Sequence, residues 1–329
     1  MYFVFGEPVE EFFGGVLKES SDMHVDESLR GWAHTEPMRP KTSAQLPIYI
    51  VAGKYCVTGR DVWLKYVKKF VAEKSKALLT GSLYHEVLAQ VVPAAKRYIY
   101  QNGVTADFDL RGFLQETCMT TTDQLVEKKK FDVIDTLGPT DLLEMKANMR
   151  KLWNFQMGQI CAAVDLVLSK HYEIDADSLV AKALPLSVEQ RIDGSRIGLS
   201  SQLYVDAMNV PHTVIMDTKT GRQHEFHRLT ITGYALAYES EYHKPVNLGI
   251  ILYPKFVKHK SVPYVIKKPF MINDELRREF LAERDRKAAI IQTKEDPGIV
   301  DEVYKDDLEI RCPVSCGFFK VCHPEREAV

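Results

Sequence analysis

The hydrophobic pattern of this 329-residue chain changes its period near Pro185, and that change constrains the fold more than any other feature. Upstream, between about residues 108 and 184, apolar residues recur at the spacing of helices. Downstream come short β-rich runs broken by glycine, asparagine and proline, which predict strands over 187–192, 197–208 and 213–218. The sequence therefore predicts a helical region followed by a sheet.

The pattern after residue 218 completes the predicted sheet. It indicates a helix over 225–241, a buried strand over 246–253, a returning edge strand over 264–266 and a helix over 274–292. This order predicts an α/β fold with a mixed central sheet and a helical insertion before it. We divide the chain into an appended segment (1–48), a mostly helical region (49–184), the core (185–296) and a C-terminal cysteine segment (297–329).

Composition excludes several classes of protein. No apolar run approaches the roughly 18 residues of a membrane span. The first residues lack a basic region and carry Glu7, which is unlike a secretory signal, so we expect a cytoplasmic protein with reduced cysteines. The net charge of −2 argues against a binder driven by bulk charge alone. It permits a local basic groove, and residues 254–269 hold five lysines and no acid, although a solvated basic hairpin explains them equally well.

A carboxylate–lysine pattern lies within residues 202–219. Asp206 is near the end of the first predicted strand of this segment, and Asp217, Thr218 and Lys219 end the second. Side chains alternate along a strand, so Asp217 and Lys219 share a face, and pairing of the strands places Asp206 opposite Asp217. Two converging carboxylates suit Mg²⁺ or Mn²⁺. Lys219 could then orient or help deprotonate an attacking water while neutralising developing phosphate charge. The alternative is a surface ion pair beside an unrelated aspartate.

His85 lies on a predicted helix for which Ser82 is the expected N-cap. It shares the apolar stripe of that helix with Leu88 and Val92, while Glu86 lies off it. A histidine in this position is either a satisfied core residue or a metal ligand.

Three of the six cysteines fall within the last 18 residues: Cys312, Cys316 and Cys322. Thiolates this close can share one soft metal centre, and tetrahedral zinc and iron–sulfur sites need four ligands. The fourth ligand is either His323 or the distant Cys56, which lies in a turn-like segment. Cys118 and Cys161 lie in helical patterns and are expected to be core thiols.

The order of these pieces resembles the RecB-like iron–sulfur nucleases of CRISPR adaptation, the Cas-four type. The order is one early cysteine, a helical Gly-Ser-x-x-His, an aspartate, Asp-x-Lys-Thr-Gly and a three-cysteine tail. Arg30-Gly31-Trp32 and the segment YCVTGRDVWL (55–64) look closer still to the archaeal branch that accompanies type I-A systems.

The resemblance implies a PD-(D/E)XK nuclease core (restriction-endonuclease-like) and a [4Fe–4S] cluster. By position, a divalent metal is bound by His85, Asp206, Asp217 and the carbonyl of Thr218, with Lys219 as the catalytic lysine. The cluster ligands implied are Cys56, Cys312, Cys316 and Cys322.

The family also carries a Gln-x-x-x-Tyr element, in which Tyr234 fits the tyrosine and Thr230 replaces the glutamine. Tyr234 is thereby expected to contact DNA. Asp217 stands where glutamate is commoner, and the carboxylate is kept.

The function implied is a metal-dependent DNA exonuclease that trims single-stranded ends of prespacers, with the CRISPR integrase and other adaptation proteins as partners. One alternative is a RecB-like repair nuclease outside CRISPR. Another is a DNA-end-binding module whose metal site is vestigial.

Overall fold

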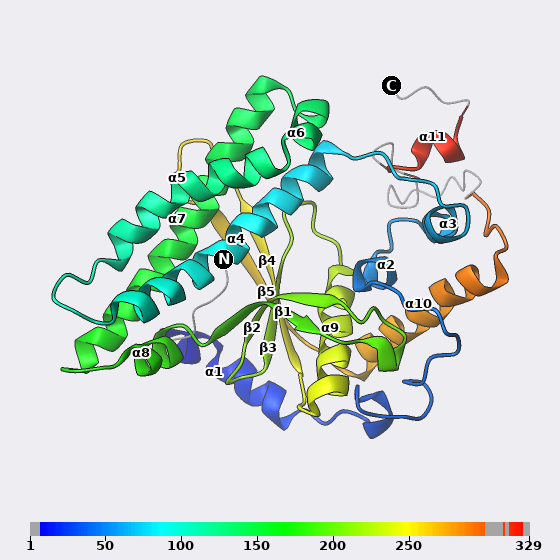
Figure 1. Cartoon of the computed structure of the whole chain (residues 1–329). Coiled ribbons are helices and arrows are strands. Elements are labelled where there is room, and N and C mark those ends of the chain that lie inside the picture. Colours follow the sequence, from blue (N-terminus) through cyan, green and yellow to red (C-terminus); the bar gives the residue numbers. More distant parts are fainter. Residues whose placement is uncertain (1–6, 300–311, 313–315, 325–329) are drawn as a thin grey trace.

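The computed structural model describes residues 7–299, 312 and 316–324, and its centre is a five-stranded mixed sheet (Figure 1). The strands follow one another across it in chain order: β1 (Leu186–Ile192), β2 (Leu203–Asn209), β3 (Val214–Thr218), β4 (Leu248–Lys255) and β5 (Tyr264–Met271). All neighbours are antiparallel except β3 and β4, which are parallel and are joined through helix α9 (His227–Tyr242). The predicted mixed α/β fold is confirmed.

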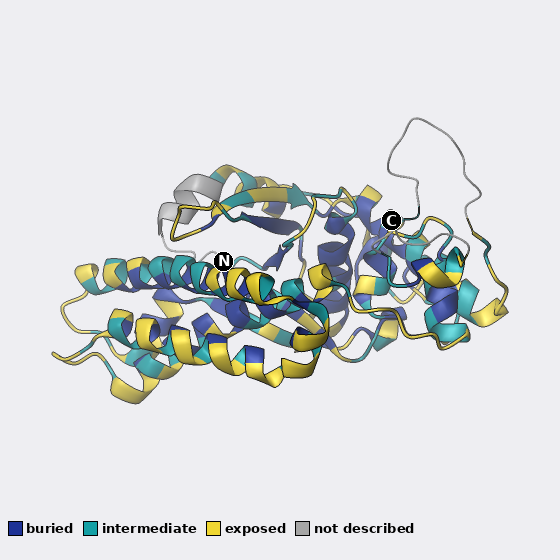
Figure 2. Cartoon of the chain, turned by 90° about the horizontal axis from the view of Figure 1, so that it is seen from above, coloured by how far each residue is buried: buried dark blue, intermediate teal, exposed yellow. Residues whose placement is uncertain are grey.

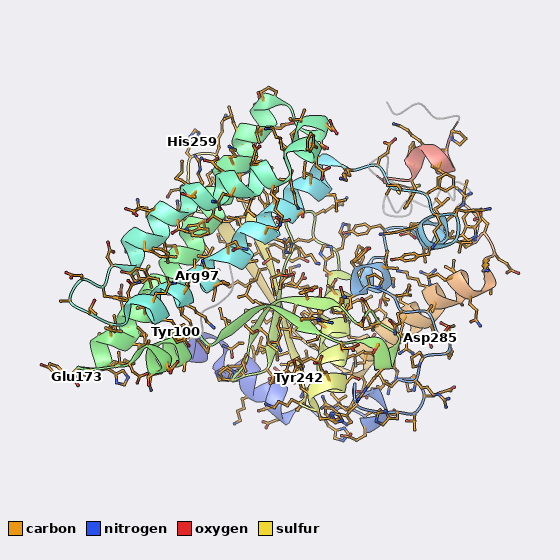
Figure 3. The ribbon with its side chains drawn as sticks, in the orientation of Figure 1. Arg97, Tyr100, Glu173, Tyr242, His259 and Asp285 are labelled. Atoms are coloured by element: carbon orange, nitrogen blue, oxygen red, sulfur yellow. The ribbon has the colours of Figure 1, made fainter. Side chains whose placement is uncertain are left out.

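A helical layer covers one face of the sheet. Its members are α4 (Lys76–Asn102), α5 (Leu110–Lys128), α6 (Lys130–Thr136), α7 (Pro139–Lys170) and α8 (Ala176–Ala183). Alternate residues of the central strands, such as Val214 and Met216 of β3, point into this layer and pack with its buried side chains. The hairpin between β4 and β5 reaches the same layer: Figure 3 labels His259 beside it, and Lys151 Nζ of α7 donates to the Val257 carbonyl at 3.3 Å.

The opposite face is covered by α9, α2 (Ile48–Ala52) and α10 (Asp274–Thr293). Ile215 and Ile251 point to this side and pack in a second core, which also takes in Val25, Leu29 and Met38. The sheet is therefore the middle of three layers. Figure 2 shows the buried positions gathered inside, with the outer sides of the helices exposed.

The remaining helical elements are short or peripheral. They are α1 (Glu7–Asp22), the turns η1 (Glu27–Leu29), η2 (Trp63–Val67) and η3 (Ser195–Ile197), α3 (Arg60–Val62) and α11 (Phe319–Cys322). None of the described helices is both long and apolar enough to cross a membrane.

A buried ionic network ties the N-terminal segment to α9 and α10. Glu239 is fully buried and accepts hydrogen bonds from Arg277 at 2.7 and 2.9 Å and from Arg30 at 2.9 Å. Its carboxylate also accepts from the backbone N–H groups of Gly31 at 2.9 Å and Val246 at 3.0 Å. One acidic side chain therefore satisfies donors from three separate parts of the chain, around residues 30–31, 246 and 277.

Two local predictions were wrong. Helix α4 begins at Lys76 rather than after Ser82, because Ser75 supplies the N-cap and accepts from the Leu78 N–H at 3.2 Å. The strand predicted over 197–208 begins only at Leu203, since a helical turn and Gly198 in the left-handed region (φ 74°) precede it.

Candidate active site and cysteine pocket

The pairing of β2 with β3 brings the two predicted aspartates together. The paired residues are Ala207 with Met216, Met208 with Ile215, and Asn209 with Val214. One step further along this ladder, Asp206 lies opposite Asp217, and the Thr218 N–H donates to Asp206 Oδ2 at 3.2 Å. Both carboxylates thus lie at the same edge of the central strands, with 14% and 4% of their side chains exposed.

His85 reaches this edge from α4. Its Nδ1 lies 3.0 Å from Asp206 Oδ2, and 29% of its side chain is exposed. Leu88 and Val92, with which the sequence grouped it, are buried in the helical layer. Burial alone would lower the pKa of His85, but the Asp206 carboxylate outweighs it, so the pKa is raised. His85 is therefore a polar partner of the acids and not a core histidine.

Lys219 completes the group from the end of β3. Its Nζ lies 3.0 Å from Asp217 Oδ2 and its backbone N–H donates to the Leu252 carbonyl at 2.9 Å. Burial and the neighbouring charge of Asp206 raise the pKa of Asp217 to about 6. Burial opposes the charge on Lys219, yet the two carboxylates raise its pKa, so the ammonium persists at neutral pH.

Two further residues border the acids, and the sequence pointed to only one of them. Glu189 lies in β1 between residues paired with Val205 and Ala207, which places it opposite Asp206, and its φ is 49°. Burial and the Asp206 charge raise the pKa of Glu189 to about 7. Tyr234 comes from α9, and burial together with the charges of the acids raises its pKa well above 10. Only the strand register reveals Glu189, and no motif marks it.

The donor set at this edge has the chemistry of a site for a hard divalent ion, with carboxylate and carbonyl oxygens and one imidazole. Asp217 Oδ2 is buried, and the cation beside it is the Lys219 ammonium 3.0 Å away, in the position that a divalent ion would compete for. As the side chains stand, each carboxylate instead faces a protein cation, His85 or Lys219. Within the described residues, no three His, Cys, Asp or Glu side chains are arranged to hold a metal.

The four cysteines predicted to act together line one cavity of about 410 Å³: Cys56, Cys312, Cys316 and Cys322. Burial and the three neighbouring thiols raise the pKa of Cys312 to about 11. Arg60 Nη1 lies 3.2 Å from the Cys322 sulfur. His323 is not among the described residues that line the cavity, and its ring packs against Phe319.

Contacts between distant segments hold this cavity together. Trp63, Leu64 and Phe318 form a small apolar cluster beside it. The Glu73 N–H donates to the Gly317 carbonyl at 3.0 Å, and the Trp63 indole donates to the Lys294 carbonyl at 2.9 Å. Cys118 and Cys161, by contrast, are buried in the helical layer, as predicted.

Comparison with known proteins identifies the family of this chain. Residues 14–325 match the family model described as CRISPR-associated exonuclease Csa1. The chain belongs to the Csa1 family of CRISPR-associated exonucleases. A Csa1 protein of Saccharolobus solfataricus is 35% identical over 303 residues, covering 92% of this chain and 93% of that protein. A Csa1 protein of Thermoproteus tenax is 26% identical over 302 residues, covering 91% of each chain.

These matches extend over nearly the whole chain. The Csa1 family model spans both the aspartate–lysine edge and the cysteine cavity. The family membership confirms the CRISPR-linked nuclease class that the sequence resemblance implied.

Proposed function

We propose that this Csa1-family chain is a metal-dependent DNA exonuclease with a PD-(D/E)XK site, acting on single-stranded ends of prespacers in CRISPR adaptation. The observation that carries the proposal is the convergence of Asp206, Asp217, Lys219 and His85 at one edge of the sheet. Both relatives are named as exonucleases, which supports the exonuclease class.

The chemistry is divided between the residues and an ion. His85, Asp206, Asp217 and the Thr218 carbonyl would hold Mg²⁺ or Mn²⁺, which supplies a nucleophilic water at neutral pH and neutralises phosphate charge. Lys219 Nζ lies 3.0 Å from Asp217 Oδ2, so it can hydrogen-bond a phosphate oxygen or orient the attacking water. Tyr234, which borders the acids, is our proposed DNA contact on α9.

For the cysteine cavity we propose a [4Fe–4S] cluster held by the four thiols that line it. Four cysteines meet the ligand count of such a cluster, and the absence of His323 from the described lining favours it over a Cys₃His zinc site. The cluster would join the segment around Cys56 to the C-terminal segment. A brown preparation containing iron supports this assignment, and a colourless one containing a single zinc contradicts it.

Cleavage of end-labelled single-stranded DNA in the presence of Mn²⁺ tests the nuclease. We expect Lys219→Ala and Asp217→Ala to lower the rate by about 100-fold or more, because the first removes a cation beside the reacting phosphate and the second removes a ligand of the proposed metal ion. Lys130→Ala is the matched control, since its ammonium is exposed and pairs only with a surface glutamate. Unchanged cleavage by Lys219→Ala would refute the assignment of this site as the nuclease active site. Copurification with the CRISPR integrase tests the proposed partner.

A further inference from the structure

Beside the proposed nuclease site lies a group of aromatic side chains that the mechanism does not use. The ring of Tyr55 meets the rings of Phe226 and His224 edge to face, with centroids 4.8 and 5.5 Å away. The rings of His224 and Phe226 are themselves stacked, at 4.8 Å and an interplanar angle of 19°. Tyr55 is 59% exposed, and the other two side chains are partly exposed. We call these three residues the aromatic platform.

A chain of hydrogen bonds connects the platform to the catalytic strand. The Tyr55 hydroxyl lies 3.2 Å from His227 Nε2, and His227 Nδ1 lies 3.0 Å from the Tyr253 hydroxyl. Tyr253 directly follows Leu252, whose carbonyl accepts the N–H of Lys219. The charges of Lys219 and Asp217 also act on the pKa of Tyr55, which burial raises. The platform therefore lies close enough to Lys219 and Asp217 for their charges to act on Tyr55.

The support beneath the platform is rigid. His227 and Tyr253 are 5% and 1% exposed, and burial together with the Lys219 charge lowers the pKa of His227 to about 3. A neutral His227 can donate from one ring nitrogen and accept at the other, which satisfies both tyrosine hydroxyls at every physiological pH. An exposed ring held by a buried pair loses little conformational freedom on binding, and this favours a binding role over a packing role.

The charges around the platform suit a nucleic acid. Lys268 of the edge strand β5 is exposed, and its Nζ lies 5.9 Å from the centre of the Tyr253 ring. Lys219 is bonded through its backbone N–H to Leu252, the residue before Tyr253. Exposed aromatic rings flanked by lysines are the combination by which proteins hold unpaired bases and their phosphates.

We propose that Tyr55, His224 and Phe226 form a stacking site for an unpaired nucleobase at the end of single-stranded DNA. The site would hold the end of the strand while the adjoining phosphate lies at Lys219, and it thereby selects frayed over paired ends. This inference deepens the proposed nuclease function and rests on it. Stacking of one base on such a site contributes about 5- to 150-fold in affinity.

Binding measured without metal isolates this step from cleavage. The full-length protein in EDTA is titrated with single-stranded oligonucleotides that carry 2-aminopurine at one end, at the other end or in the interior. We expect quenching of the terminal fluorophore at one end. By fluorescence anisotropy, an abasic nucleotide at that end should weaken binding by about 5- to 150-fold.

Variants then assign the effect to the platform. Tyr55→Ala should bind intact and abasic ends equally, whereas Tyr55→Phe keeps the ring and should keep the preference. Phe226→Ala is the second test if Tyr55→Ala fails to fold by circular dichroism. Tyr172→Ala is the control: this tyrosine is fully exposed and adjoins Glu173, which Figure 3 labels at the far end of the helical layer.

The outcomes separate the two proposals. Equal binding of abasic and intact ends by the wild-type protein, quenching confined to the interior position, or an unchanged preference in both Tyr55→Ala and Phe226→Ala would each overturn the stacking site. None of these results touches the nuclease assignment, which depends on the Mn²⁺ cleavage assay with Lys219→Ala.

Discussion

Truncation of Glu239 to alanine should destabilise the protein far more than the loss of any surface carboxylate. Glu239 is fully buried and balances two guanidinium groups, of which Arg277 is also fully buried and Arg30 is largely buried. Arg277 keeps hydrogen bonds to the carbonyls of Leu29, Ile272 and Val246 when the carboxylate is removed. Its charge nevertheless loses the anion that offsets its desolvation.

The expected magnitude follows from that burial. Breaking a buried ion pair by removing one partner costs about 3–5 kcal/mol, because an uncompensated charge stays in the interior. The N–H groups of Gly31 and Val246 lose their acceptor as well, so we expect the upper half of this range. Against a total stability of about 5–15 kcal/mol, the variant approaches the unfolding threshold.

Urea unfolding followed by far-ultraviolet circular dichroism measures the effect. With a denaturant slope of about 1–3 kcal/mol per molar, the midpoint should fall by 1 M or more. Glu127→Ala is the matched control: its carboxylate is 70% exposed, pairs with Lys130 across the junction of α5 and α6 and should contribute at most about 1 kcal/mol. A Glu239→Ala loss below about 1 kcal/mol, or equal to that of the control, would refute the reasoning.

Three further outcomes can be measured. With a chelator present, the pKa of Asp217 in the folded protein is about 6, above its ordinary value of 3.8. The folded state therefore binds the Asp217 proton more tightly than the unfolded state does, and the stability of the protein falls as the pH rises from about 4 to about 6. Asp217→Asn should lack this loss, and wild-type and variant stability curves that run parallel across this window would contradict it. Cys56→Ser should yield colourless protein without iron, and iron retained in that variant excludes Cys56 as a ligand. Lys287→Met should lower the free energy of unfolding by about 1–3 kcal/mol, because Lys287 Nζ donates to three carbonyls at 2.7–2.9 Å. Lys320→Met is the control, since Lys320 is exposed and its replacement should change stability very little. Equal urea midpoints for the two variants would contradict this expectation.

The sequence was sufficient for the sheet and for its acidic edge. Strands β2 and β3 are short, apolar and separated by a turn, so their pairing and the opposition of Asp206 and Asp217 follow from spacing. The start of α4 did not follow, because Ser82 fits the pattern of an N-cap although it lies inside the helix, which begins at Lys76. In the structure a Cβ at Gly81 would lie 3.2 Å from Thr220 Oγ1, so this glycine lets α4 approach the loop after Lys219.

Other parts of the site depend on contacts between segments far apart in the chain. Glu189 requires the register of β1 on β2, and the aromatic platform gathers Tyr55 with His224 and Phe226 across about half the chain. No periodicity encodes such a meeting. The same holds for Glu239, whose partners come from the N-terminal segment and from α10.

The Arg30-Gly31 pair that contributed to the family resemblance has a structural explanation. Arg30 and the Gly31 N–H both bind Glu239, and a Cβ at position 31 would collide with the Leu236 carbonyl. Only glycine permits this close approach of the N-terminal segment to α9. These two residues therefore fix the scaffold, and no contact of theirs reaches the acidic edge in the described structure.

The segment around Tyr55 connects the two centres of the molecule. Lys287 holds the carbonyls of Ile50, Val51 and Gly53 before it, and Arg286 Nη1 donates to the Thr58 carbonyl at 3.2 Å after it. Between these anchors, Cys56 lines the cysteine cavity, and the preceding residue, Tyr55, reaches His227 beside the nuclease site. Adjacent residues cannot move independently over such a short anchored span. Any group held by the four thiols therefore also restrains the backbone next to Tyr55. Loss of that group should weaken the proposed stacking of a DNA end on Tyr55 before it disturbs the proposed metal-binding acids, Asp206 and Asp217.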